Sequence, residues 1–134
     1  MADTTLSLVL FSGTDDKLQA AAVLTVGAAA MERKVNILLQ YWALDCFRAD
    51  RVLMEHGVAP EAGDAGLQAM QAQGKVHWSD LFRQSKDLGD VQIYACSDSM
   101  EMFHLARGDL DPVVDGIWGV ASFFLEADGP VTFI

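Results

Sequence analysis

Short, nearly continuous apolar runs recur along the chain, separated by longer stretches whose apolar residues fall at helical spacing. The short runs are typical of strands buried on both faces, and they predict strands at residues 6–11, 35–40, 91–95, 113–115 and 131–134. The longer stretches predict helices at residues 15–31, 45–55, 78–88, 97–106 and 116–127. Apolar strands that alternate with helices indicate an α/β fold, a parallel sheet covered by helices on each side.

Polar residues mark where several of these helices begin. Thr14 or Asp15 is expected to cap the first helix and Asp45 the second, while His77 is expected as a loop or cap residue before the third. Residues 61–74 are small and polar and include three glycines. This segment predicts a mobile excursion or a short helix.

The composition narrows the class of protein. The chain has 134 residues, of which 51% are hydrophobic, so we expect one globular domain spanning residues 1–134. Its formal net charge of −10 disfavours nucleic acid and anionic membrane surfaces as partners. The most apolar stretch, residues 18–31, is too short to span a bilayer, and the start of the chain lacks the cationic character of a signal peptide. A cytoplasmic protein is therefore expected.

The two cysteines, Cys46 and Cys96, match neither zinc-ligand nor disulfide-framework spacing. We therefore expect no metal site and no cofactor. In a reducing compartment such a cysteine is either part of the core or a working thiol.

Cys96 directly follows the third predicted strand and directly precedes a predicted helix. A thiol at a helix N-terminus meets free backbone N–H groups and the positive end of the helix dipole, which favour the nucleophilic thiolate. We expect this turn to be exposed at the carboxyl edge of the sheet, where ligands of parallel sheets gather. Cysteine is also a common small buried residue, so the position alone leaves both interpretations open.

The spacing around Cys96 tests several thiol chemistries. A phosphatase loop needs Cys-x5-Arg, but Met102 stands at the sixth position and the first arginine is Arg107. Ser99 completes a Cys-x-x-Ser pair, which is a weak signal after a third strand. His104, eight residues on, is about two helical turns away and too distant for a simple base, unless it belongs to the site of a neighbouring subunit. Phosphatase chemistry is excluded, and thioredoxin chemistry is disfavoured.

Four segments together carry a resemblance to a known family. They are residues 94–102 (Tyr-Ala-Cys-Ser-Asp-Ser-Met-Glu-Met), residues 9–17 before an alanine-rich helix, residues 41–44 (Tyr-Trp-Ala-Leu) and residues 116–121 (Gly-Ile-Trp-Gly-Val-Ala). In this order they resemble the DsrE/DsrF-like (DsrEFH-like) sulfur-transfer family over nearly the whole chain. The chain resembles particularly its stand-alone branch, often labelled peroxiredoxin-like.

The resemblance implies a three-layer α/β/α domain with a five-stranded parallel sheet, a homo-oligomer, and a persulfide carried on the cysteine at position 96. Residues 61–74 depart from the family pattern, and no functional residue is placed there. Cys46 is expected along the same sheet edge, either to resolve a persulfide or, more often for such a residue, to pack in the core.

From these arguments Cys96 is the candidate reacting residue. The candidate binding residues follow the predicted strands or flank the thiol: Ser12, Gly13, Trp42, Ser97 and Met100. The backbone N–H groups of Ser12 and Gly13 offer a small anion site or a frame for the thiol. For Trp42, a place in the core and a place in the wall of the pocket are equally compatible with the sequence. For Met100, with Met102 and Phe103, core packing is favoured over shielding of a persulfide.

The leading hypothesis is a cytosolic sulfur carrier, a sulfurtransferase-like protein whose partners are a sulfur donor protein and an acceptor protein. The alternative is a non-catalytic module of the same fold that binds a small ligand or another protein, with an inert Cys96. A thiol peroxidase is a third and weaker option. The sequence does not decide between catalytic turnover and single-use carriage.

Overall fold

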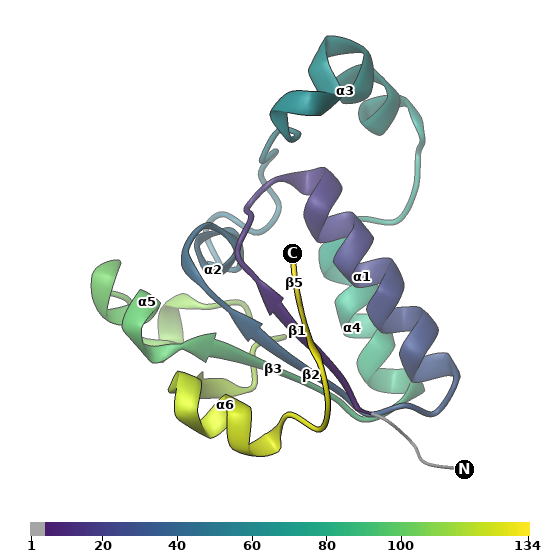
Figure 1. The fold of residues 1–134 in the computed structure, drawn as a ribbon. Coiled ribbons are helices and arrows are strands. Elements are labelled where there is room, and N and C mark those ends of the chain that lie inside the picture. The colour runs from purple at the N-terminus through teal and green to yellow at the C-terminus, as the bar shows by residue number, and fades with distance from the viewer. Residues whose placement is uncertain (1–4) are drawn as a thin grey trace.

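The computed structural model describes residues 5–134 and forms one five-stranded parallel sheet (Figure 1). The strands are β1 (Leu6–Leu10), β2 (Val35–Leu39), β3 (Val91–Cys96), β4 (Gly116–Trp118) and β5 (Val131–Phe133). Their order across the sheet is β4-β3-β2-β1-β5, and each neighbouring pair is parallel. The predicted α/β fold with a five-stranded parallel sheet is confirmed.

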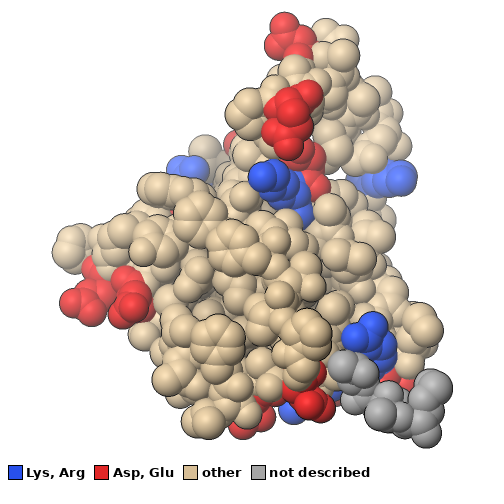
Figure 2. Space-filling model, viewed as in Figure 1, with Lys and Arg blue, Asp and Glu red and all other residues tan. Residues whose placement is uncertain are grey.

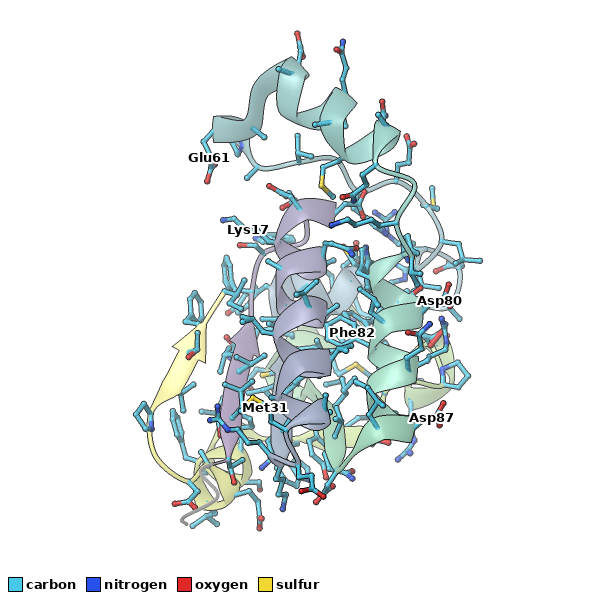
Figure 3. The ribbon with its side chains drawn as sticks, turned by 90° about the vertical axis from the view of Figure 1, so that its right-hand side faces the viewer. Lys17, Met31, Glu61, Asp80, Phe82 and Asp87 are labelled. Atoms are coloured by element: carbon cyan, nitrogen blue, oxygen red, sulfur yellow. The ribbon has the colours of Figure 1, made fainter. Side chains whose placement is uncertain are left out.

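Helices lie on both faces of this sheet. They are α1 (Asp15–Ala30), α2 (Tyr41–Cys46), α3 (Gly63–Ala72), α4 (Trp78–Leu88), α5 (Ser97–Met102) and α6 (Val120–Glu126). Two short 3-10 turns, Pro60–Ala62 and Arg107–Asp109, complete the elements. Helices α1 and α4 pack side by side on one face (Figures 1 and 3), and α6 lies on the other. Helices α2 and α5 stand at the carboxyl end of the sheet.

The core is divided unequally between the two faces. The main cluster lies under α1 and α4 and includes the aromatic rings of Phe47, Trp78 and Phe82. The ring centroids of Trp78 and Phe82 lie 5.0 and 5.6 Å from that of Phe47. A second, much smaller cluster is centred on Phe123 of α6. Because burial of apolar area is the main favourable term in folding, most of the stabilisation comes from the first face.

The prediction of a helix at residues 45–55 is wrong. Helix α2 begins directly after β2 and ends at Cys46, and the following residues form turns. Asp45 does not cap a helix, because it lies inside α2, one residue before that helix ends. Its carboxylate pairs with Arg48 at 3.3 Å and with Arg51 at 3.1 Å, both in the segment of turns that follows.

The predictions of a strand at residues 113–115 and of a helix starting at residue 116 are also wrong. The carboxylate of Asp111 accepts a hydrogen bond from the Val113 N–H at 3.0 Å, which holds this segment in a turn. Residues 116–118 are β4, and Trp118 stacks on Tyr94 of β3 with ring centroids 3.6 Å apart. The last helix is correspondingly shorter than predicted.

Smaller differences concern helix ends. The helix predicted at residues 97–106 ends at Met102, since His104 takes a left-handed φ of 54°. Thr14 is the N-cap residue of α1 but makes no side-chain capping bond. His77 caps α4 as expected, because its Nδ1 accepts a hydrogen bond from the Ser79 N–H at 3.2 Å.

The segment at residues 61–74 contains α3, so the short helix that the sequence allowed is present. No residue of α3 is buried. The helix stands beyond the N-terminal end of α1, and in the space-filling view it forms a separate lobe (Figures 1 and 2).

Candidate functional site: a thiol at the carboxyl edge of the sheet

Cys96 is the last residue of β3 and the N-cap residue of α5, so it lies at the strand-to-helix junction that the sequence predicts. Strand β3 is flanked by β2 and β4, and the chain after β2 therefore passes close to the thiol. There the amide nitrogen of Gln40 donates a hydrogen bond to the Cys96 Sγ at 3.8 Å. The sulfur thus sits between two strand ends, beside a polar donor.

The turn is exposed at Ser97, as expected, but the thiol is not, because Cys96 is only 1% exposed. It packs in the smaller cluster with Val9, Leu38 and Phe123. Tyr94 and Trp118 pack against the same cluster. A molecule that reacts with Sγ therefore reaches it only after some of these side chains move.

The turn between β2 and α2 is strained and is tied to the thiol segment. Tyr41 has a φ of 43°, in the left-handed region that an aromatic residue rarely adopts. Its backbone N–H donates to the buried Ser99 hydroxyl at 3.0 Å. This bond joins α2 to α5 one turn beyond Cys96. Strain of this kind is concentrated at functional sites, where the surrounding structure holds it in place.

The structure brings together some of the candidate binding residues. Ser12, Gly13 and Trp42 line one pocket of about 290 Å³ at the end of β1. Ser97 is exposed at the start of α5 and does not line this pocket. Met100 is buried in the main core, which is the interpretation that the sequence favoured for it. The five residues therefore divide among three surroundings.

Several residues at this edge were missed by the sequence analysis. Lys17 lines the pocket, and its Nζ donates to the Ser12 hydroxyl at 3.4 Å. Gln40 donates a hydrogen bond to the Cys96 thiol, and Trp118 packs against the cluster that contains it. Gln40 is the polar residue at the carboxyl end of the strand predicted at residues 35–40, and this position could have identified it as a site residue. Trp118 lies in one of the segments that carry the resemblance, but its place beside the thiol could not be predicted, because residues 116–118 are a strand where the pattern predicts a helix.

Cys46 occupies a different environment. Its Sγ donates a hydrogen bond to the Gly13 carbonyl at 3.2 Å, and the residue belongs to the main core. Burial, with a smaller contribution from the charge of Asp45, raises the pKa of the Cys46 thiol from 9.0 to about 12. Both cysteines are free thiols, and they pack in separate clusters. Cys46 is therefore a protonated core residue at neutral pH.

Aromatic rings form a continuous series along the same edge. Consecutive ring centroids are 5.6, 5.3, 6.3 and 6.0 Å apart in the series Phe133, Phe11, Tyr41, Trp42, Phe103. The series crosses the ends of β5, β1 and β2 and reaches the chain after α5. It gives the carboxyl edge near the thiol an apolar surface.

Within residues 5–134, no group of three His, Cys, Asp or Glu side chains is placed to hold a metal ion. No helix in this range has the length and apolar character needed to cross a bilayer.

Solved structures share this fold. YchN of E. coli matches with a TM-score of 0.57 and 12% identity, over 99% of this chain and 100% of YchN. MTH1491 of Methanobacterium thermoautotrophicum matches with a TM-score of 0.54 and 14% identity, over 98% of this chain and 100% of that protein. Residues 2–65 match the DsrE/DsrF/DrsH-like family. This match confirms the resemblance to the DsrE/DsrF-like family that the sequence predicts.

A further relative is YrkE of Bacillus subtilis (strain 168), which is 27% identical to this chain over 146 residues. The similarity covers 91% of this chain and 90% of YrkE. The family match at residues 2–65 includes the β1–α1 turn and α2 but not Cys96. The role of the thiol therefore has to be argued from its surroundings, and the assignment to the peroxiredoxin-like branch stays a prediction.

Proposed function

We propose that this DsrE-like protein carries sulfane sulfur as a persulfide on Cys96, with a sulfur donor protein and an acceptor protein as its partners in the cytoplasm. The family is associated with sulfur relay, which sets the class of chemistry. The observation that carries the proposal is the free Cys96 thiol at the end of β3, where the Gln40 amide meets its Sγ at 3.8 Å. An amide donor there stabilises the charge that the sulfur bears during exchange.

The reaction consists of two displacements. The Cys96 thiolate attacks the terminal sulfur of a donor persulfide, R–S–SH, so that a new S–S bond forms on Cys96. The donor S–S bond breaks at the same time, and the donor leaves as the thiolate R–S⁻. An acceptor thiolate then attacks the terminal sulfur of Cys96–S–SH, and the Cys96 thiolate is regenerated. The sulfur moves without net oxidation, so no further oxidant or reductant is needed.

Burial of the thiol sets a requirement on this cycle. Phe123 of the seven-residue helix α6 closes the cluster around Cys96. Short helices with little buried area open at low free-energy cost compared with global unfolding. We therefore place the opening step at α6 rather than at the sheet, in a protomer whose α6 face is not covered by a second copy.

Persulfide formation is tested by intact-protein and peptide mass spectrometry after incubation with polysulfide. We expect additions of about 32 Da per sulfur on the peptide that contains Cys96, and their complete loss in Cys96→Ser. Cys46→Ser is the matched control, because it removes the other thiol and is expected to retain the addition. An unmodified Cys96 with every sulfur donor, or an addition confined to Cys46, would contradict the proposal.

The burial of Cys96 favours a second candidate function, a non-catalytic binding or interaction module with an inert thiol. The two are separated by iodoacetamide labelling of the native protein across pH. A carrier labels at Cys96 before unfolding, whereas the module labels only when denaturant is added. Cys46, whose pKa is raised to about 12, provides the internal standard for an unreactive thiol.

We also propose that the protein is a homo-oligomer that associates through the α6 face. Large apolar side chains are exposed there, with Phe124 at 58% and Leu125 at 86% exposure, and Phe133 of β5 is also exposed. Figure 2 shows this face as almost uncharged, with acidic residues at its rim, although the chain has a net charge of −10. An apolar patch of this kind in an acidic protein is typical of an interface with a second copy.

A charge placed in this face is expected to dissociate the oligomer. Leu125→Glu puts a carboxylate in the centre of the apolar surface, where a partner would bury it unpaired. The measurement is the mass in solution by light scattering after size exclusion. Met31→Glu is the control, since Met31 is 76% exposed at the end of α1 on the opposite side of the sheet. A monomeric wild type, or equal masses for wild type and Leu125→Glu, would refute the interface.

A further inference from the structure

A second cavity lies away from the thiol, beneath α3. Its volume is about 440 Å³, within the range of small-molecule pockets. It is bounded by α3, by the chain at residues 53–58, by the chain at residues 75–78 and by the first turn of α1. Figures 1 and 3 show α3 standing over the N-terminal end of α1, which is the end that forms the floor.

The floor of the cavity is firmly held. The Asp15 carboxylate accepts one hydrogen bond from the Trp78 indole Nε1 at 2.9 Å and another from the His56 backbone N–H at 2.8 Å. The Asp15 N–H donates to the Gly57 carbonyl at 2.9 Å. Asp15 therefore fixes the chain on both sides of α3, at residues 56–57 before it and at Trp78 after it.

The roof is built differently. Leu67 and Met70 of α3 point their apolar side chains to the cavity, yet no residue of the helix is buried. Opposite them lie Leu53, Met54 and Val76. Polar side chains, among them Gln19, Gln71 and Gln73, line the rest of the cavity. A ligand that fills the space would bury the apolar side chains on both sides, and this burial would stabilise the complex. Methionine side chains adapt to varied ligand shapes, because they are flexible and polarizable.

The charged groups at the cavity define the ligand further. Asp15 and Glu55 contribute two carboxylates, against the single ammonium of Lys75. His77 uses Nδ1 to accept the capping hydrogen bond, and burial lowers its pKa, so it adds no positive charge at neutral pH. The pocket therefore has a net negative charge in a chain whose net charge is −10. Anionic ligands are disfavoured there.

We infer that the cavity under α3 binds a small apolar amine, with its ammonium group near Glu55 and Asp15 and its apolar part between Met70 of α3 and the chain at residues 53–58. Asp15 already accepts two hydrogen bonds, so Glu55 is the carboxylate free to pair with the ligand. The site is independent of the proposed sulfur chemistry, because none of the residues around Cys96 line it.

The test compares three probes that share one ring system: 1-naphthylmethylamine, 1-naphthylmethanol and 1-naphthoic acid. Dissociation constants are measured by calorimetry on the full chain. We expect saturable binding of the amine, weaker binding of the alcohol, and at least tenfold weaker binding of the acid than of the amine (about 1.4 kcal/mol per factor of ten). Glu55→Gln is expected to remove the preference for the amine over the alcohol.

Two lysine variants of α3 locate the site. Met70→Lys places a cation in the roof and is expected to weaken amine binding at least tenfold. Ala69→Lys adds the same charge to the exposed side of the same helix and is expected to change binding less than twofold. Neither position is buried, so circular dichroism is expected to show a native fold for both. Cys96→Ser is expected to bind the amine normally.

Several results would overturn the inference. They are the absence of saturable binding of all three probes up to about 1 mM, binding of the acid as tight as that of the amine, and equal binding by the Met70→Lys and Ala69→Lys variants. The last result would place the ligand elsewhere, for example in the pocket lined by Ser12 and Trp42.

Discussion

Gly13→Ala is expected to destabilise the protein by about 3 kcal/mol, the upper end of the usual cost of overpacking. A Cβ atom at this position would lie 2.5 Å from the Trp42 carbonyl oxygen and 2.8 Å from its carbonyl carbon. Both atoms belong to the backbone at the start of α2, so they cannot rotate away. The β1–α1 turn or α2 has to shift, and the hydrogen bond from Cys46 to the Gly13 carbonyl is strained with it. The measurement is the free energy of unfolding in urea.

Gly27→Ala provides a control of opposite sign. Gly27 lies inside α1, and a Cβ atom there meets nothing within 4 Å. Replacing glycine with alanine in an open helical position is expected to stabilise the protein by about 0.5–1 kcal/mol. A Gly13→Ala variant within about 0.5 kcal/mol of the wild type would show that α2 is free to move. In that case the pocket beside Gly13 would not be preformed.

The second large effect is an alkaline loss of stability that depends on Cys46. Its folded-state pKa is raised from 9.0 to about 12, so the unfolded chain ionises first as pH rises. The stabilisation from keeping this thiol protonated is complete below pH 9 and is lost as pH rises through the folded-state value of about 12. The expected loss in this window is on the order of 1 kcal/mol per pH unit.

Cys46→Ala removes this titration and serves as the comparison. Unfolding free energies of the two proteins are measured from pH 7 to pH 11. We expect a constant difference below pH 9 and a difference that shrinks steadily above it. Tyr94, whose pKa is raised by burial, titrates in both proteins and cancels in the comparison. Parallel curves over the whole range would show that Cys46 ionises equally in the folded and unfolded chains.

The sequence predicts the sheet well and its C-terminal part poorly, for physical reasons. The first three strands are apolar runs flanked by turn residues, and in a parallel sheet both of their faces are buried. Residues 116–125 are apolar almost throughout, so periodicity cannot separate a strand from a helix there. The decision is made by tertiary contacts, namely the stacking of Trp118 on Tyr94 and the turn held by Asp111.

The candidate site, too, could be predicted from the sequence only in part. The location of Cys96 at a strand-to-helix junction follows from local sequence. Its burial does not, because Val9 and Phe123, which cover it, come from opposite ends of the chain. The donor at Gln40 depends likewise on which strands are neighbours. Composition and periodicity carry no information on such long-range pairings.

The hydrogen bonds of Asp15 affect how well the chain tolerates insertions and deletions around α3. Because the carboxylate holds the His56 amide and the Trp78 indole together, the segment between them is a closed loop whose ends are fixed by the body of the protein. The entropy cost of closing such a loop rises only slowly with its length. Residues can therefore be added to or removed from this loop at little cost to the sheet. Because of Asp15, the segment around α3 can vary in length and sequence while the thiol and its strands remain as they are.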